Sequence, residues 1–175
     1  MGLLSAPVCL GQITETNGFV RIEAEISTNR VSRTINGTTY AWTNDTATPG
    51  FSGTGYIEAA DTVSTNATTV TNSWESTSPQ INYTLTFSNA GTYHVWIRGY
   101  AGDAASAGVY VGLNGSSLAN PRIDLQQFNA WAWANTAAGS TNLVTLNIPS
   151  AGTYTLNLWG ADLLLIECKS VCQNP

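Results

Sequence analysis

The chain has 175 residues, six of them basic and eleven acidic, which gives a formal net charge of −5. Charged residues make up only 10% of the sequence, too little positive charge for binding nucleic acid or an anionic membrane surface. The six tryptophans argue against disorder, and no apolar run approaches the roughly 18 residues of a membrane span.

Alternating apolar and polar residues predict strands, and no segment shows a helical period with caps at both ends. In chain order the predicted strands are 19–26, 55–60, 81–87, 92–100, 107–113, 143–148, 153–159 and 163–168. Two pairs of neighbours have short Gly-containing connections and share an AGTY sequence, so we expect two hairpins: 81–87 with 92–100, and 143–148 with 153–159. Many short strands separated by turn residues are typical of an antiparallel β-sandwich.

The sandwich is expected to occupy residues 19–172 as a single domain. Residues 1–18 contain no basic residue ahead of a short apolar run, so they lack a complete signal peptide. We read them as an N-terminal extension, either a truncated leader or an expression remnant. Residues 173–175 are read as a tail.

Three cysteines lie near the chain ends: Cys9, Cys168 and Cys172. Their odd number leaves at least one unpaired. Either one disulfide ties the ends of an exported domain, or all three are thiols without a role. The Thr-, Ser- and Asn-rich, Lys-poor composition favours a secreted protein.

Signatures of hydrolytic enzymes fail in this chain. The only histidine, His94, lies in a predicted strand, and GFSGT (50–54) only approaches GxSxG. CxxC and HExxH spacings are absent. A glycosidase needs two carboxylates across a cleft, and the Trp-bearing loops offer only Asp45, Asp61 and Glu75. We expect no enzyme, with a small glycan-acting hydrolase or lyase as the alternative.

Three long polar connections carry tryptophan, which is unusual for segments of this kind. They cover residues 27–54, 61–79 and 125–142, and their tryptophans are Trp42, Trp74, Trp131 and Trp133. An exposed indole face matches the C–H face of a pyranose, and neighbouring polar groups hydrogen-bond its hydroxyls. The alternatives are that these rings plug the ends of the core, or that they bind a protein in an adhesion module.

Two glutamates share one face of the first predicted strand. In RIEAEI the apolar residues alternate, so Glu23 and Glu25 lie together on the other face, about 7 Å apart. Like charges at this spacing repel, and calcium, which takes six to eight oxygen ligands, would relieve the repulsion. The alternative is a solvated edge strand with Arg21 nearby.

Several motifs occur in an order that resembles carbohydrate-binding modules of families 6 and 35 and their malectin-like relatives, over roughly residues 19–171. They are RIEAE (21–25), GFSGTGYIEA (50–59), AGTYHVWIRGY (90–100), VYVGLNG (109–115), WAWANT (131–136) and AGTYTLNLWGADLLLIE (151–167). The resemblance implies a single-domain, all-β jelly-roll sandwich of the galactose-binding-like type that binds polysaccharide without cleaving it.

The resemblance also implies site residues. Tyr56 and Trp131 match the stacking walls of the loop-end sugar site, with Trp42 and Tyr40 nearby. Hydrogen bonds to the sugar are assigned to Asn135 and Asp162, although the Asn that the family often has before the last strand is missing. A second family site lies on the concave sheet face, and the long segment 61–79 can reshape either site. A structural calcium is assigned to Glu23, Glu25 and Glu167, with Asp162 as the alternative last-strand ligand.

The expected ligand is a plant cell-wall polysaccharide with an extended chain, such as β-glucan or xyloglucan. Stacking and neutral hydrogen bonds would carry the binding, so it should be weak and nearly independent of salt. Modules of these families are usually appended to secreted glycoside hydrolases, and we expect this one to be monomeric, with no nucleic-acid or membrane partner.

Overall fold

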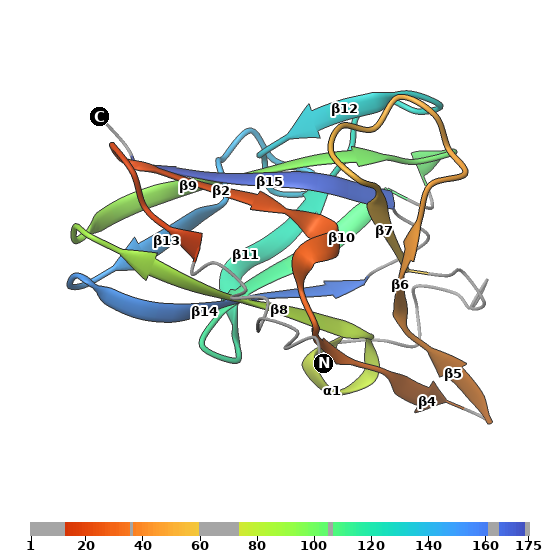
Figure 1. The fold of residues 1–175 in the computed structure, drawn as a ribbon, viewed down its shortest axis with the longest axis horizontal. Helices are drawn as coiled ribbons and strands as arrows, with labels where there is room; N and C mark the ends of the chain where they lie inside the picture. The colour runs from red at the N-terminus through yellow and green to blue at the C-terminus, as the bar shows by residue number, and fades with distance from the viewer. Residues whose placement is uncertain (1–12, 36, 60–73, 105–106, 161–164, 174–175) are drawn as a thin grey trace, which may run out of the picture.

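The computed structural model describes residues 13–35, 37–59, 74–104, 107–160 and 165–173, with backbone only at 165 and 167–173. Two β-sheets face each other across one core, and the short helix α1 (Trp74–Thr77) lies outside the lower sheet (Figure 1). The expected all-β sandwich is therefore confirmed. No helix in these ranges has the length and apolar character needed to cross a membrane.

The lower layer, sheet A, has the strand order β1-β8-β14-β10-β11, with β3 also paired to β8. All its pairs are antiparallel except β1 with β8. Its strands are β1 (Ile13–Thr14), β3 (Asn29–Val31), β8 (Gln80–Phe87), β10 (Gly108–Leu113), β11 (Ser116–Asp124) and β14 (Gly152–Gly160).

The upper layer, sheet B, has the order β12-β9-β15-β7-β6, with β13 also on β9 and β2 on β15. A separate hairpin of β4 (Arg33–Ile35) and β5 (Thr38–Tyr40) extends from one end of the sandwich (Figure 1). The strands of sheet B are β2 (Phe19–Glu23), β6 (Trp42–Asp45), β7 (Tyr56–Ala59), β9 (Gly91–Tyr100), β12 (Trp131–Ala134), β13 (Thr145–Ile148) and β15 (Leu165–Gln173).

Period-2 alternation builds the core. In β8 the residues Ile81, Tyr83, Leu85 and Phe87 are all buried, and the residues between them face away from the core. The facing strand β9 repeats the pattern. Burying each large apolar side chain contributes about 1.5 to 3 kcal/mol, so these two strands alone account for much of the driving force for sheet packing.

The two expected hairpins are wrong. β8 lies in sheet A and β9 in sheet B, and β13 and β14 are likewise divided between the sheets. Each connection is thus an arch over the end of the core. Alternation shows that one face of a strand is buried, but strands of a hairpin and strands of an arch bury that face equally well.

The repeated AGTY sequence stabilises both arches in the same way. The hydroxyl of Tyr93 shares its proton between Glu15 and the carbonyl of Asn89, which lies at 3.0 Å, and the hydroxyl of Tyr154 donates to the carbonyl of Ser150 at 2.9 Å. Both rings meet Phe87 edge to face, with centroids at 4.7 and 5.8 Å. The repeat therefore marks two equivalent corners of the sandwich.

The first expected strand, 19–26, is shorter in the structure. β2 ends at Glu23, and a 3₁₀ turn, η1 (Ala24–Ile26), follows. Ala24 is buried, and its carbonyl accepts a hydrogen bond at 2.8 Å from the buried hydroxyl of Tyr83. This bond holds the turn against sheet A, and Ile26 is left exposed.

The expected boundaries at the chain ends also shift. Part of the predicted extension 1–18 belongs to the fold, because β1 pairs with β8 and Glu15 is buried. The last strand runs to Gln173, one residue into the predicted tail. The strands β3 to β6 and β12 fall in segments predicted to be polar connections, where Thr, Ser and Asn obscure the alternation, and β11 was not predicted.

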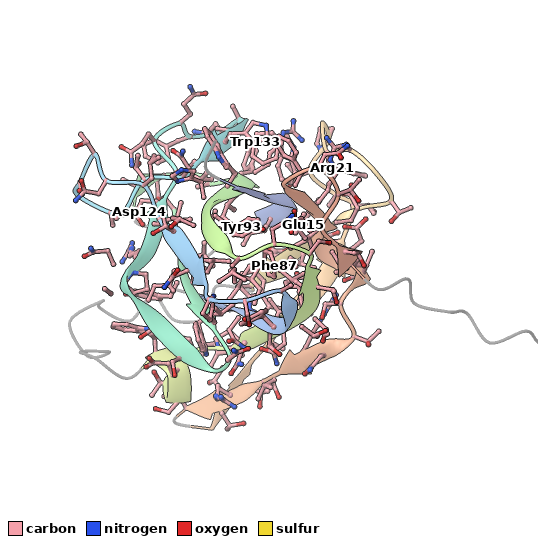
Figure 2. The ribbon with its side chains drawn as sticks, turned by 90° about the vertical axis from the view of Figure 1, so that its left-hand side faces the viewer. Glu15, Arg21, Phe87, Tyr93, Asp124 and Trp133 are labelled. Carbon is pink, nitrogen blue, oxygen red and sulfur yellow. The ribbon has the colours of Figure 1, made fainter. Side chains whose placement is uncertain are left out.

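Glu15 fixes β1 to the β8–β9 arch. Its carboxylate accepts hydrogen bonds from the backbone N–H of Ser88 and Asn89, from the Asn89 side chain and from the Tyr93 hydroxyl, at 2.8 to 3.1 Å. Figure 2 shows Glu15 beside Tyr93 and Phe87 between the sheets. Burial alone raises the pKa of Glu15, but the hydrogen bonds outweigh it, and the net pKa is lowered. The same contact and burial raise the pKa of Tyr93 to about 12.

Acid should therefore destabilise this arch. A carboxyl with a lowered folded-state pKa stabilises the protein above its unfolded pKa and loses that contribution as pH falls through the folded pKa. We expect Glu15→Gln to cost about 2 kcal/mol at pH 7 and much less at pH 3, measured by urea unfolding. Glu58→Gln is the control, because the pKa of Glu58 is raised. Equal costs of Glu15→Gln at both pH values would contradict the role of the charge.

Candidate functional site

The two expected stacking residues meet each other on the outer side of sheet B. Tyr56 and Trp131 are in edge contact, with ring centroids 5.4 Å apart. Trp131 also meets Tyr100 at 5.8 Å, and the guanidinium of Arg98 lies 5.6 Å from the Trp131 ring centroid. The family motifs thus bring these rings together, as the resemblance implied.

Burial removes three of the four rings expected to contact sugar. Tyr56 is 1% exposed, Trp42 3% and Tyr40 8%, so none presents a ring face to a saccharide. Trp42 packs in the core, and its indole N–H donates to the carbonyl of Pro79 at 3.0 Å. Tyr56 is covered by the β6–β7 loop (residues 46–55), which also contacts the half-buried Trp131. As binding residues, Tyr56, Trp42 and Tyr40 are corrected to packing residues.

The expected hydrogen-bonding residues do not join the ring pair among the described residues. Asn135 follows the last residue of β12, four positions from Trp131 and thus about 13 Å along the strand direction. Its carbonyl accepts a hydrogen bond from the backbone N–H of Val144 at 2.8 Å. Asp162 lies outside the described residues.

Glu23 and Glu25 converge although Glu25 sits on the 3₁₀ turn rather than on the strand. A Cβ placed on Gly53 would lie 3.4 Å from Glu25 Oε1 and 3.5 Å from Glu23 Oε2, so both carboxylates reach the same point of the β6–β7 loop. Thr54 Oγ1 donates to Glu25 Oε1 at 2.8 Å. Glu25 Oε2 is buried without a hydrogen-bond partner among the described residues.

This arrangement fits a divalent cation in part. Paired carboxylates with a buried unbonded oxygen are the hard ligands that calcium prefers. The described His, Cys, Asp and Glu side chains form no group of three able to hold a metal, so further ligands have to come from elsewhere. The backbone of Glu167 precedes Cys168, which pairs with Glu23 in register, and this places Glu167 on the neighbouring strand.

A second carboxyl pair lies on β6 and β7 and was missed as a pair in the sequence. Asp45 and Glu58 are hydrogen-bonded to each other, and Tyr56 also bonds Asp45. Backbone N–H groups of Thr46 and Ala47 lower the pKa of Asp45. Burial and the charge of Asp45 raise the pKa of Glu58. A pair in direct contact leaves no room for a sugar or a water between its members.

The outer face of sheet A carries a different aromatic group. Trp74 of α1 stacks flat on Tyr110 of β10, with centroids 4.3 Å apart and an interplanar angle of 4°. The guanidinium of Arg122 lies 5.9 Å from the Tyr110 centroid. Trp159 pairs with Tyr110 in register and points to the same face, but it is buried. The described part of segment 61–79, residues 74–79, therefore lies on this face of sheet A.

Three buried N–H groups near this stack have no hydrogen-bond acceptor within the described ranges: Nε1 of Trp74, Nε1 of Trp159 and Nε of Arg33. Arg33 belongs to the same surroundings, because its Nη2 donates to the carbonyl of Glu75 on α1 at 3.1 Å. All three are donors only.

A ladder of neutral amides continues this face across sheet A. Asn157 donates to Asn82 Oδ1 at 2.7 Å, and Asn82 donates to Asn29 Oδ1 at 3.1 Å. Gln80 also donates to Asn82 Oδ1, at 2.6 Å. We use the name ladder face for the Trp74–Tyr110 stack together with these amides. Its polar groups carry no charge, which suits hydroxyl-rich ligands.

The exposed aromatic rings lie elsewhere. Trp133 is 48% exposed on β12, and Phe19 and Phe128 are also exposed. Figure 2 shows Trp133 and Arg21 on the outer side of sheet B. Trp133 therefore offers a natural comparison with the ladder face, because it stands on the opposite sheet.

The backbone of β15 limits the disulfide alternatives. Cys168 and Cys172 are four residues apart in one strand, so their Cα atoms are about 13 Å apart. A disulfide requires less than about 7 Å, so these two cannot pair with each other. Cys9 lies outside the described residues, and a bridge from it stays a prediction.

No protein-family model matches the sequence, and neither does any curated protein sequence. Solved structures do match. The Podospora anserina GH26-CBM35 β-(1,4)-mannanase is 20% identical with a TM-score of 0.59, covering 91% of this chain but only 28% of the mannanase chain. A family 35 module from Paenibacillus barcinonensis is 18% identical with a TM-score of 0.57, covering 89% of this chain and 99% of the module. The C-terminal family 6 module of a Zobellia galactanivorans laminarinase is 15% identical with a TM-score of 0.56, covering 89% and 99%. The chain therefore has the fold of family 35 and family 6 carbohydrate-binding modules, as its motifs predicted.

Proposed function

We propose that this protein is a non-catalytic carbohydrate-binding module that contacts its ligand through the ladder face. The observation that carries the proposal is the partly exposed Trp74–Tyr110 stack beside a row of neutral amides. The fold, which is that of known carbohydrate-binding modules, supports it independently.

The chemistry of the ladder face suits a saccharide. One face of the Trp74 ring lies on Tyr110, and we propose that the partly exposed remainder of the ring contacts the C–H groups of a pyranose. The partly or fully exposed amides of Asn29, Gln80 and Asn82 beside the stack can exchange hydrogen bonds with sugar hydroxyls. Because these interactions involve few formal charges, binding should depend little on salt.

We prefer the ladder face to the loop-end site as the place of sugar binding, because one ring of the loop-end pair is buried. Tyr56 is buried beneath the β6–β7 loop, so the loop-end pair offers only the partly exposed Trp131, whereas Trp74 and Tyr110 are both partly exposed. We therefore transfer the stacking role from Tyr56 to Trp74. An extended polysaccharide such as β-glucan or xyloglucan suits a face that runs across several strands.

Catalysis is disfavoured by the carboxyl geometry. Glycosidases hold their two carboxyl groups about 5 Å or more apart, so that a sugar or a water fits between them. Asp45 and Glu58 are hydrogen-bonded to each other instead. We infer that the protein serves a partner or appended glycoside hydrolase, as a secreted and monomeric module.

We further propose a structural calcium ion at Glu23 and Glu25. The convergence of both carboxylates on Gly53 and the buried, unbonded Glu25 Oε2 support it. Calcium would neutralise the pair and join β2 to the β6–β7 loop. Glu167 is the acid on the last strand that we assign as a further ligand.

Affinity gel electrophoresis against β-glucans, xyloglucan, xylans, mannans and pectins tests the binding proposal. We expect retardation by at least one polysaccharide, and roughly tenfold weaker binding for Trp74→Ala and for Tyr110→Ala, as expected for the loss of about 1.4 kcal/mol of stacking. Trp133→Ala, on the opposite sheet, is the matched control and should bind normally.

Four outcomes would contradict the proposal. Normal binding by a folded Trp74→Ala, Tyr110→Ala double variant would exclude the ladder face as the binding site. Loss of binding in Trp133→Ala alone would move the site to sheet B. No retardation by any polysaccharide would favour the adhesion alternative, and release of reducing ends would favour an enzyme.

A further inference from the structure

We propose that the β6–β7 loop is a cation-controlled cover: a divalent cation at Glu23 and Glu25 holds it closed over Trp131, and loss of the cation frees the ring. This inference rests on the calcium site proposed above. It goes beyond that site, because it gives the cation control over an aromatic surface for saccharides.

One part of the loop closes the ring pair. The indole N–H of Trp131 donates to the carbonyl of Pro49 at 2.9 Å, and Thr48 N–H donates to the Tyr56 hydroxyl at 3.0 Å. Phe51 meets Tyr56 edge to face, with centroids 5.7 Å apart. These contacts occupy the Tyr56 ring and the polar edge of Trp131.

The fit over Trp131 depends on Gly50. Its φ of +96° lies in the left-handed region, and a Cβ there would lie only 3.0 Å from Trp131 Cδ1. Arg98 reinforces the contact from below, because its Nη2 donates to the Gly50 carbonyl at 3.4 Å while its guanidinium lies over the Trp131 ring. A side chain at position 50 would push the loop off the ring.

The next part of the loop meets the carboxylates. Gly53 lies against both Glu23 and Glu25, and Thr54 donates to Glu25 through its hydroxyl at 2.8 Å and its backbone N–H at 3.4 Å. Only two residues separate Gly50 from Gly53, a reach of at most about 11 Å. The part of the loop over Trp131 and the part that contacts the carboxylates therefore cannot move far independently of each other.

The cation would act on the loop through electrostatics. Without it, the two carboxylates that converge on Gly53 repel each other. With it, the same oxygens become ligands, since calcium accepts carboxylate and carbonyl groups together. Cation binding thus favours the closed loop, and by linkage a ligand that needs Trp131 open would weaken cation binding.

Fluorine NMR of the full chain labelled with 5-fluorotryptophan tests this inference. The six tryptophans give one resonance each, and the Trp131→Phe variant assigns Trp131. We expect chelation to shift the Trp131 resonance towards that of an exposed indole and to increase its solvent isotope shift. Added calcium should reverse both changes, and the Trp133 resonance, two residues along the same strand, should not respond.

Two variants sharpen the test. Glu25→Gln should leave Trp131 in the chelated state whether or not calcium is present. Gly50→Ala should expose Trp131 even with calcium, while chelation still changes its melting temperature. A Trp131 resonance that ignores chelation, although the melting temperature falls, would overturn the cover and leave the calcium site standing. No response in either measurement would overturn both, and the ladder-face binding assay is independent of each.

Discussion

Chelation of divalent cations should lower the melting temperature by about 5 to 10 °C. A cation present at 100 times its dissociation constant stabilises the folded state by about 2.7 kcal/mol, and a domain of this size shifts by about 2 to 4 °C per kcal/mol. The physical source is the paired Glu23 and Glu25 carboxylates, which converge on Gly53 and repel when no cation is bound. Differential scanning calorimetry with chelator and with calcium measures the shift.

Glu25→Gln should abolish the response to chelator, and Glu58→Gln should keep it. Glu58 is a suitable control because its carboxyl lies on neighbouring β7 but pairs with Asp45 instead. A melting temperature unaffected by chelator, in protein shown by elemental analysis to be free of calcium, would contradict the cation site.

Gly112→Ala should destabilise the protein by about 3 kcal/mol, or about 10 °C in melting temperature. A Cβ on Gly112 would lie 2.4 Å from the carbonyl oxygen of Ser116 and 2.5 Å from Trp159 Cζ3. The backbone of β11 and the buried Trp159 ring flank this position and have little room to move. Thermal unfolding of the variant tests whether Trp159 lies across β10 as described.

Gly102→Ala is the matched control, because nothing lies within 4 Å of a Cβ at that position. It should change the stability by less than about 0.5 kcal/mol. If both alanine variants melt like the parent protein, Trp159 does not pack on Gly112. The packing of Trp159 described for the ladder face would then be wrong.

The fold class was predictable because sheet packing depends on a repeated local pattern. Strands β8 and β9 alternate so regularly that their core faces follow from the sequence. Their partners did not follow. An AGTY corner leads equally well into a hairpin or an arch, and only the second sheet, which supplies the facing apolar surface, selects the arch.

The carboxylate pair and the aromatic pair show what short sequence motifs can predict. RIEAE brings Glu23 and Glu25 together in the structure, although Glu25 lies on a 3₁₀ turn. The family motifs likewise bring Tyr56 to Trp131. Neither motif indicates accessibility. Tyr56 is buried because residues 46–55, which show no strand or helix periodicity, fold over it.

The sequence by itself determined three things: the classes of partner that its low charge excludes, the β-sandwich, and the residues that share one face of a strand. These features depend only on charge and on period-2 alternation. Only the tertiary structure decided which aromatic rings face water. Exposure depends on what the long connections cover, and such contacts between distant segments leave no periodic trace in the chain. Tyr56, which was expected to stack on sugar, lies buried beneath the β6–β7 loop for this reason, and we assign the stacking role to Trp74 instead.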